Sequence, residues 1–278
     1  MPPATYPRHP LTKVPEVTVW FWIVKVLTTG MGEATSDYLV HRMSPVIAVG
    51  IGFVMFVVAM AFQFAVRRYR TWVYWFAVVM VAVFGTMAAD VLHVGLGIPY
   101  VVSTAFFAAV LAVIFIVWYR TERTLSIHSI YTPRRELFYW ATVVTTFALG
   151  TAAGDFTART AGLGYLGSGF MFAAVIAVPA IAYWIARRGP VAAFWAAYIV
   201  TRPLGASFAD WLGWGHRVGG LGLGLGTVSV GSTLLIVAFV AYLAVSHKDV
   251  PLPAAARPSV PGRHRASLQP REYPGESF

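Results

Sequence analysis

Residues 21–37 read FWIVKVLTTGMGEATSD, and the spacing inside this stretch occurs four times in the chain. Each copy has an aromatic residue, a Trp, nine residues, a Gly, four residues and an Asp. The four copies are Trp22, Gly32 and Asp37; Trp75, Gly85 and Asp90; Trp140, Gly150 and Asp155; and Trp195, Gly205 and Asp210. Four of the five Asp residues therefore occupy one repeat position, at the end of a strongly apolar stretch. A carboxylate is costly in such a place, which indicates a specific role.

The composition is that of a membrane protein. Of the 278 residues, 58% are hydrophobic and 12% are charged, whereas a soluble domain is nearer half apolar and a quarter charged. The chain has no cysteine, which excludes disulfides, thiolate metal sites and Cys nucleophiles. We read the net charge of +10 as basic residues that flank membrane spans, not as a nucleic-acid surface. The expected partner is the lipid bilayer, and the oligomeric state stays open.

The apolar runs predict an all-α polytopic membrane protein with eight transmembrane helices, since a span needs about 20 residues. We expect these spans near 17–38, 44–66, 72–93, 100–119, 136–157, 165–186, 191–212 and 224–246. The odd-numbered spans carry the motif, and each even-numbered span follows one of them. The membrane domain, 17–246, thus divides into four helical hairpins, at about 17–66, 72–119, 136–186 and 191–246. Residues 1–16 are expected to form a cytoplasmic segment and residues 247–278 a disordered cytoplasmic tail.

The distribution of Lys and Arg predicts the orientation. One set of loops and termini holds 16 basic residues, and the opposite loops hold only Arg42, Arg159 and Arg217. By the positive-inside rule, both termini are cytoplasmic and each motif helix runs outward. The loop 120–135 separates two halves of four spans each. An even number of spans makes the repeats parallel, so any symmetry axis should lie along the membrane normal.

A helical wheel collects the polar groups of the odd spans on one side. With Trp at zero and about 100° per residue, the motif Gly lies near 280° and the Asp near 60°. Lys25, Glu33 and Arg202 lie on or beside this face. The same analysis places three hydroxyls at one repeat position beside it: Thr28, Thr146 and Thr201. In a bilayer such a face must turn toward other helices or a water-filled cavity.

The acids are the candidate cation-binding residues, namely Glu33, Asp37, Asp90, Asp155 and Asp210. Glu33 and Asp37 are one helical turn apart, and two such carboxylates repel unless a cation or a proton lies between them. Lys25 and Arg202 are the only basic residues inside spans, so we expect each within ion-pair reach of an acid. Either they form structural ion pairs, or they are counter-ions that an incoming cation displaces.

The remaining motif residues have a supporting role with plain alternatives. The motif glycines should permit close helix packing. The four motif Trp are either interface anchors or part of an aromatic cage, and the three Thr either line the site or bond to their own helix. His41 and His93 follow Asp37 and Asp90 by four and three residues, a spacing that suits a transition metal. The alternative is that these His residues are exposed in loops.

Residues 13–37, which read KVPEVTVWFWIVKVLTTGMGEATSD, resemble the start of a bacterial inner-membrane family whose members are usually described as uncharacterised membrane-anchored proteins. The later Phe-Trp or Tyr-Trp and Gly-x4-Asp segments are similar too, so the resemblance covers residues 13–245. It implies a multi-pass protein of the bacterial inner membrane with internal repeats. The resemblance implies no particular activity for this chain.

No enzyme constellation is present, so we expect a non-enzyme without a resident cofactor. The leading hypothesis is a proton-coupled cation transporter, in which the four Asp form an outer cluster with Glu33 just below. Carboxylates and hydroxyls without thiolates suit Mn²⁺, Mg²⁺ or Ca²⁺ as the transported substrate. Two alternatives stay open. One is an organic-cation transporter that uses the aromatic residues, and the other is a membrane scaffold or sensor that transports nothing.

Overall fold

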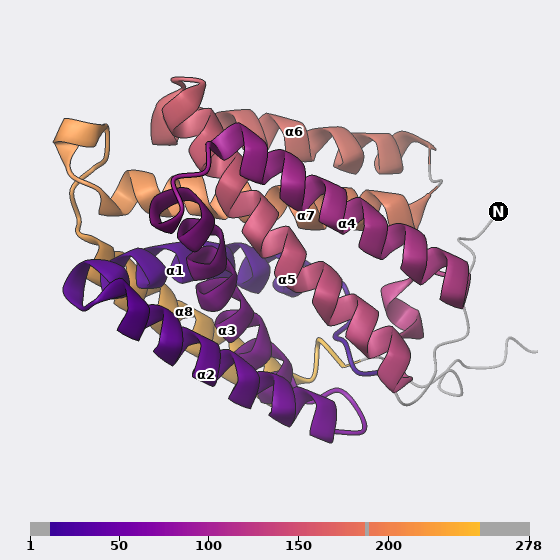
Figure 1. Cartoon of the computed structure of the whole chain (residues 1–278). Coiled ribbons are helices and arrows are strands. Elements are labelled where there is room, and N and C mark those ends of the chain that lie inside the picture. The colour runs from indigo at the N-terminus through magenta and orange to yellow at the C-terminus, as the bar shows by residue number, and fades with distance from the viewer. Residues whose placement is uncertain (1–11, 187–188, 251–278) are drawn as a thin grey trace, which may run out of the picture.

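The computed structural model describes residues 12–186 and 189–250, and the regular structure in these ranges is helical throughout. Eight long helices run side by side in a bundle (Figure 1): α1 (Val19–Arg42), α2 (Pro45–Ala65), α3 (Thr71–Asp90), α4 (Tyr100–Glu122), α5 (Pro133–Asp155), α6 (Gly164–Ala186), α7 (Pro190–Gly213) and α8 (Leu225–Ser246). Four short segments join them: the π-helices η1 (Val91–Gly95) and η3 (Phe156–Thr160) and the 3-10 helices η2 (Ile127–Ser129) and η4 (His216–Val218). The eight predicted helices are confirmed.

Local sequence explains where several helices begin and end. Pro45, Pro133 and Pro190 each open a helix, a position where the missing amide proton of proline costs nothing. Gly189, directly before α7, has φ of 66°, a left-handed conformation that glycine adopts without strain. These signals place the short loops between consecutive helices.

The four motif helices form a closed ring at the centre of the bundle. α1 packs against α3, α3 against α5, α5 against α7, and α7 against α1. The four other helices lie outside this ring, as the labels in Figure 1 allow the reader to follow. This arrangement confirms that the odd-numbered helices face a common interior.

Each outer helix packs chiefly against the inner helix that follows it in the chain. α2 lies on α3, α4 on α5 and α6 on α7, and α8 closes the circle on α1. We had expected each motif helix to pair mainly with the span after it, as a hairpin. The loop joins two helices only at one end, so the packing of side chains along the ring decides which helix covers which groove.

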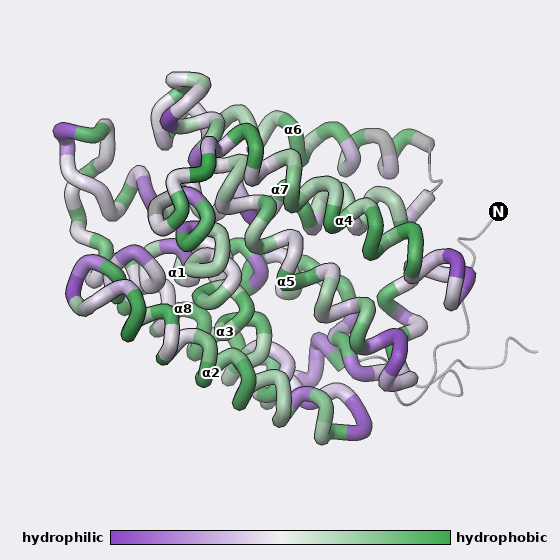
Figure 2. The backbone as a smooth tube through the Cα atoms, viewed as in Figure 1, coloured by the Kyte–Doolittle hydropathy of each residue, from purple (hydrophilic) through white to green (hydrophobic). Residues whose placement is uncertain are grey.

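Burial separates the inner helices from the outer ones. In the most apolar stretch of each helix, 56% of the residues are buried in α3 and 67% in α5, but only 17% to 22% in α2, α4, α6 and α8. These six helices are long and apolar enough to cross a membrane, and the outer ones are hydrophobic along most of their length (Figure 2). The chain is a multi-pass membrane protein. α1 and α7 are less apolar because they carry Lys25, Glu33 and Arg202.

The motif glycines set the spacing of the ring. Each glycine lies against the residue seven positions after the Trp of the next repeat, and the fourth closes on the first. A Cβ added to Gly32, Gly85, Gly150 or Gly205 would lie 2.5 Å from Ala82 Cβ, 2.8 Å from Phe147 Cβ, 2.3 Å from Arg202 Cγ or 1.8 Å from Thr29 Oγ1, respectively. No real side chain tolerates these distances, so the glycines are required for close packing, as predicted.

The segments at one end of the bundle are tied together by buried polar contacts. Lys13 Nζ lies 2.5 Å from Glu136 Oε2, and Gln63 donates to the other oxygen of Glu136 at 3.0 Å. The Asp249 carboxylate accepts hydrogen bonds from the Tyr69 hydroxyl and, at 3.0 Å, from Thr71. Burial, followed by the Asp249 charge, raises the pKa of Tyr69 far above its usual range, so the phenol stays a neutral donor.

The described part of the predicted tail is anchored at one residue. The predicted tail begins at residue 247, and Asp249 is buried and accepts a hydrogen bond from the Glu16 amide, while His247, Lys248 and Val250 are exposed. Likewise, residues 12–16 of the predicted N-terminal segment are anchored through Lys13. The cause is a buried carboxylate in each case: Lys13 donates to Glu136, and Asp249 accepts from Tyr69 and Thr71. Composition does not reveal such contacts. The rest of both predicted segments, 1–11 and 251–278, lies outside the described residues.

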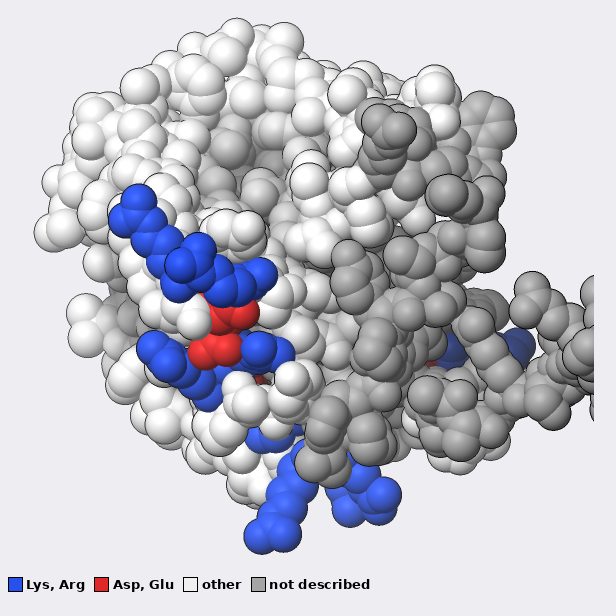
Figure 3. All heavy atoms as spheres, turned by 90° about the vertical axis from the view of Figure 1, so that its right-hand side faces the viewer, with Lys and Arg blue, Asp and Glu red and all other residues white. Residues whose placement is uncertain are grey.

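We call this end of the bundle the basic end, because exposed arginines gather there. They lie in the α2–α3 connection, at the end of α4 and at the start of α5, and are Arg67, Arg68, Arg70, Arg120, Arg123 and Arg134. Figure 3 views the molecule from this side and shows the blue basic groups surrounding a small acidic patch. At this end Glu122 forms ion pairs with Arg135 at 2.8 Å and with Arg134 at 3.5 Å. The opposite end carries Arg42, Arg159 and Arg217.

Replacing Gly32 with alanine should destabilise the ring. The new methyl group would meet the Ala82 backbone carbon at 2.8 Å as well as its side chain, so α1 and α3 must separate, at a cost of about 1–3 kcal/mol. Gly50→Ala is the matched control, since a Cβ there meets nothing within 4 Å and alanine favours a helix. Thermal melting in detergent should fall for Gly32→Ala only. Equal melting temperatures would contradict the close contact.

Candidate functional site

An aromatic girdle closes the interior of the ring toward the basic end. The aromatic residue before each motif Trp packs against the Trp of the next repeat, again with the fourth closing on the first. The ring-centroid distances are 5.8 Å for Phe21 and Trp75, 5.7 Å for Tyr74 and Trp140, 6.1 Å for Tyr139 and Trp195, and 5.7 Å for Phe194 and Trp22. Trp75, Trp140 and Trp195 are buried. These three Trp belong to the core and are not lipid-interface anchors.

A buried ion pair crosses the ring about halfway along it. Arg202 Nη2 on α7 lies 2.5 Å from Glu33 Oε2 on α1, and both side chains are buried. The same guanidinium nitrogen donates to the hydroxyl of Thr86 on α3 and, at 2.7 Å, to that of Thr151 on α5. One side chain from each of the four inner helices therefore meets at this point. The predicted pairing of Arg202 with an acid is confirmed, and the acid is Glu33.

Thr86 and Thr151 are residues that our sequence reasoning missed. Both directly follow the motif glycine of their repeat, which is also the position of Glu33 in the first repeat. A comparison of the four repeats at this position would have found them. The network is thus built from three equivalent positions plus Arg202, and Gly150 leaves room for the aliphatic part of that arginine.

The prediction for Lys25 is wrong. Its ammonium group is buried and has no hydrogen-bond partner among the described residues. Instead, the Lys25 Nζ atom lies over the ring of Phe147, 3.9 Å from the centroid, and over that of Tyr198, at 4.2 Å. Lys25 precedes Glu33 by two helical turns, about 12 Å along the axis, and Arg202 already occupies that acid. Cation–π contacts replace the expected ion pair.

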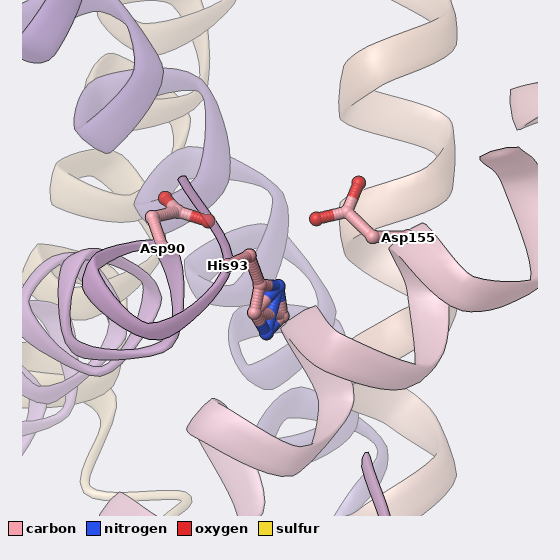
Figure 4. Close-up of side chains that lie close together, drawn as sticks. All are labelled: Asp90, His93 and Asp155. Carbon is pink, nitrogen blue, oxygen red and sulfur yellow. The ribbon is translucent and has the colours of Figure 1, made fainter. Parts of the chain in front are cut away.

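The acids gather in two groups toward the end opposite the aromatic girdle. In the first group, Glu33, Asp37 and Asp210 each offer a carboxylate oxygen, and these atoms all lie within 4.8 Å of one another. The second group has the same spacing and joins Asp90, His93 and Asp155, drawn in Figure 4. The two groups take residues from adjacent inner helices, α1 with α7 and α3 with α5, and together they hold the four Asp of the predicted outer cluster.

Other predicted residues take different places. His41 is exposed, and its Nδ1 donates to the backbone carbonyl of Asp37 at 2.6 Å, so it joins neither acidic group. The three repeat-position hydroxyls bond to carbonyls of their own helices: Thr28 to Lys25 at 2.8 Å, Thr146 to Val143 at 2.7 Å and Thr201 to Ala197 at 2.6 Å. A buried hydroxyl in an apolar helix finds its nearest acceptor there, and these three Thr are structural.

The groups near Asp155 include a second missed contact. Arg159 Nε lies 3.1 Å from Asp155 Oδ1, four residues earlier in the chain. The i, i+4 spacing could have predicted this pair. Unlike Arg202, the Arg159 side chain is 44% exposed, so water solvates part of its charge.

Arg202→Met should cost more stability than Arg159→Met. The first change leaves Glu33 buried and unpaired, a loss of about 3–5 kcal/mol, while Arg159 is 44% exposed, so water screens its pair with the buried Asp155 and the loss should be smaller. Thermal melting of the purified variants in detergent compares the two. The double variant Glu33→Gln with Arg202→Met should recover part of the loss, because it leaves no unpaired carboxylate. Equal losses for the two arginines would contradict the buried pair.

Comparison with known sequences agrees with the fourfold organisation. A family model described as Repeat of Unknown Function (DUF347) matches the chain four times, over residues 20–69, 73–124, 138–189 and 193–249. Each match begins two residues before a motif Trp and contains one inner and one outer helix. Among curated proteins no relative matches the chain, and no solved structure matches it either. The chain belongs to the DUF347 repeat family and contains four copies of the repeat.

Proposed function

We propose that the protein is a proton-coupled membrane transporter for a hard divalent cation such as Mn²⁺, Mg²⁺ or Ca²⁺. The observation that carries the proposal is the first acidic group, in which Glu33, Asp37 and Asp210 bring carboxylate oxygens within 4.8 Å of one another inside the bundle. Three carboxylates so close repel unless positive charge lies among them. An all-oxygen set of this kind suits hard cations.

Arg202 gives this group a built-in competitor. Its guanidinium supplies the positive charge that Glu33 requires, and it also donates to Thr86 and Thr151. A cation that binds Glu33 would release the ion pair, while the two hydroxyls continue to hold the arginine within the ring. Cation binding and the Arg202–Glu33 pair would then be alternative states of one centre, which is the behaviour that coupled transport needs.

Asp210 adds an acceptor with no partner of its own. Its side chain is buried, and Oδ1 accepts no hydrogen bond from the described residues. Buried polar atoms are nearly always satisfied, so an oxygen of this kind next to two further carboxylates supports a cation ligand at this place.

The aromatic girdle would be the closed gate of such a transporter. It lies about 22 Å from the motif Asp residues along each helix, since 15 residues separate Trp from Asp. Its rings pack against one another, which argues for a barrier and against an open cage for an organic cation. In this proposal the girdle parts when the acidic group has released its proton or its cation.

The proposed orientation follows from the arginines. The basic end would face the cytoplasm of a bacterial cell and the acidic groups the outer side of the inner membrane. Both ends of the chain would then be cytoplasmic. Cysteines introduced at Arg68 and at Arg217 test this directly, because the chain has no other cysteine. A membrane-impermeant maleimide on intact spheroplasts should label the second position only.

Flux in proteoliposomes tests the transport proposal. Glu33→Gln and Asp37→Asn should reduce Mn²⁺ uptake about tenfold or more, and the dependence of uptake on a pH gradient should weaken in Glu33→Gln. Asp155→Asn should have a smaller effect, because Asp155 belongs to the second acidic group, whereas Glu33 and Asp37 lie in the group proposed to bind the transported cation. Glu122→Gln is the matched control, since this acid pairs with surface arginines at the basic end. Parental rates and pH profiles in Glu33→Gln and Asp37→Asn would leave a scaffold role for the chain.

A further inference from the structure

We infer that Asp90, His93 and Asp155 form a separate binding site for a divalent transition-metal ion. One ligand atom from each residue lies within 4.8 Å of the other two. Figure 4 shows the carboxylates of Asp90 and Asp155 turned toward each other across the space between α3 and α5, with the His93 ring beside that space. The inference concerns equilibrium binding, so it stands or falls separately from the transport proposed for Glu33.

His93 supplies evidence that is independent of the acids. Its side chain is 7% exposed, and neither Nδ1 nor Nε2 has a hydrogen-bond partner in the part of the chain that the structure describes. The ring is fixed edge-on against Tyr100, with centroids 4.6 Å apart and planes at 88°. A buried imidazole normally uses at least one nitrogen. A metal ion would use the free nitrogen of this one.

The donor set selects the kind of metal. One imidazole nitrogen with two carboxylates suits borderline ions such as Fe²⁺, Co²⁺ or Zn²⁺, whereas Mg²⁺ and Ca²⁺ prefer oxygen ligands. The site therefore differs in chemistry from the group around Glu33, which offers oxygen only. His41 also follows its motif Asp within about one helical turn, but it is excluded because it is exposed and bonded to a backbone carbonyl.

The backbone is also unusual at this place. α3 and α5 change to π-helix directly after Asp90 and Asp155, whereas α1 and α7 continue as α-helix past Asp37 and Asp210. A π-turn is wider than an α-turn and redirects the residues that follow, and such turns are frequent at functional sites. His93 lies within the π-helical segment η1, so the irregular turn determines where its ring points.

Arg159 is the counter-ion that a metal would displace. It pairs with Asp155 at 3.1 Å and donates to the Tyr100 hydroxyl at 3.0 Å. Arg159 also lines a pocket of about 380 Å³ together with Gly164, Tyr165 and Trp214. An ion bound between Asp90, His93 and Asp155 would compete with the guanidinium for Asp155, and Arg159, whose side chain is 44% exposed, can turn into water when it loses that partner.

Titration of the purified, tag-free full chain with Co²⁺ in detergent tests this site, because visible absorption of Co²⁺ reports both affinity and ligand type. His93→Gln should weaken binding about tenfold or more, since loss of a ligand costs at least as much as loss of its supporting contacts. His41→Gln is the matched control and should bind as the parent does. A large excess of Mg²⁺ should leave the bound Co²⁺ in place.

Arg159→Gln should change the Co²⁺ affinity in the opposite direction, which separates an effect on binding from general damage to the protein. Removing the competing charge should strengthen Co²⁺ binding, while Glu33→Gln should leave the His-dependent absorption band unchanged even if it abolishes transport. If His93→Gln does not fold, as judged by thermal melting without metal, Asp90→Asn and Arg159→Gln decide the question. Parental binding by His93→Gln or Asp90→Asn, or weaker binding by Arg159→Gln, would overturn the inference.

Discussion

The contact between Arg202 and Glu33 is the interaction on which the rest of the interior depends. Two full charges lie at the centre of a helical ring whose outer helices are apolar, and neither charge could remain there alone. Their pairing requires α1 and α7 to be neighbours, and the hydrogen bonds to Thr86 and Thr151 bring α3 and α5 to the same point. The network thus fixes the level at which all four inner helices meet. The glycine beside Arg202 shows that the backbone spacing is adapted to this side chain.

The same contact between one repeat and the next, made four times, closes the inner helices into a ring. In every copy, the aromatic residue and the motif glycine contact fixed positions of the next copy, and the fourth copy contacts the first. A ring of this kind needs no unique contacts to close, because the same interface occurs four times. The outer helices follow the same circular order. This explains why α8 covers α1, which is distant in sequence, and why the two halves of the chain form one body.

Sequence patterns predicted the helices and the inward face but not the partners across the ring. The 15-residue spacing from Trp to Asp placed the polar groups on one side of each odd helix, and that face does point inward. Which helix lies beside which depends on the fit of Gly32 on Ala82 or Gly150 on Arg202, and no single helix contains that information. For the same reason the partner of Arg202 was predicted only by type, and Lys25 was assigned an acid that it does not contact. His41 and His93 look alike in sequence, and only the π-turn and the burial of His93 distinguish them.

The acids show that the four copies no longer serve the same purpose. The first and fourth copies contribute Glu33, Asp37 and Asp210, whereas the second and third contribute Asp90, His93 and Asp155. Each group bridges two neighbouring inner helices, so the fourfold pattern of the backbone carries a twofold pattern of chemistry. The division also runs across the two halves of the chain, because each group takes residues from both.

Each group has one acid that is paired with an arginine. The arginine is Arg202, deep inside the ring, for the first group and Arg159, at the mouth of the ring, for the second. A single symmetric pore would place all four Asp at equal distance from one axis and would need only one such counter-ion. Two groups with different donors and different counter-ions are instead consistent with two ion sites of different chemistry.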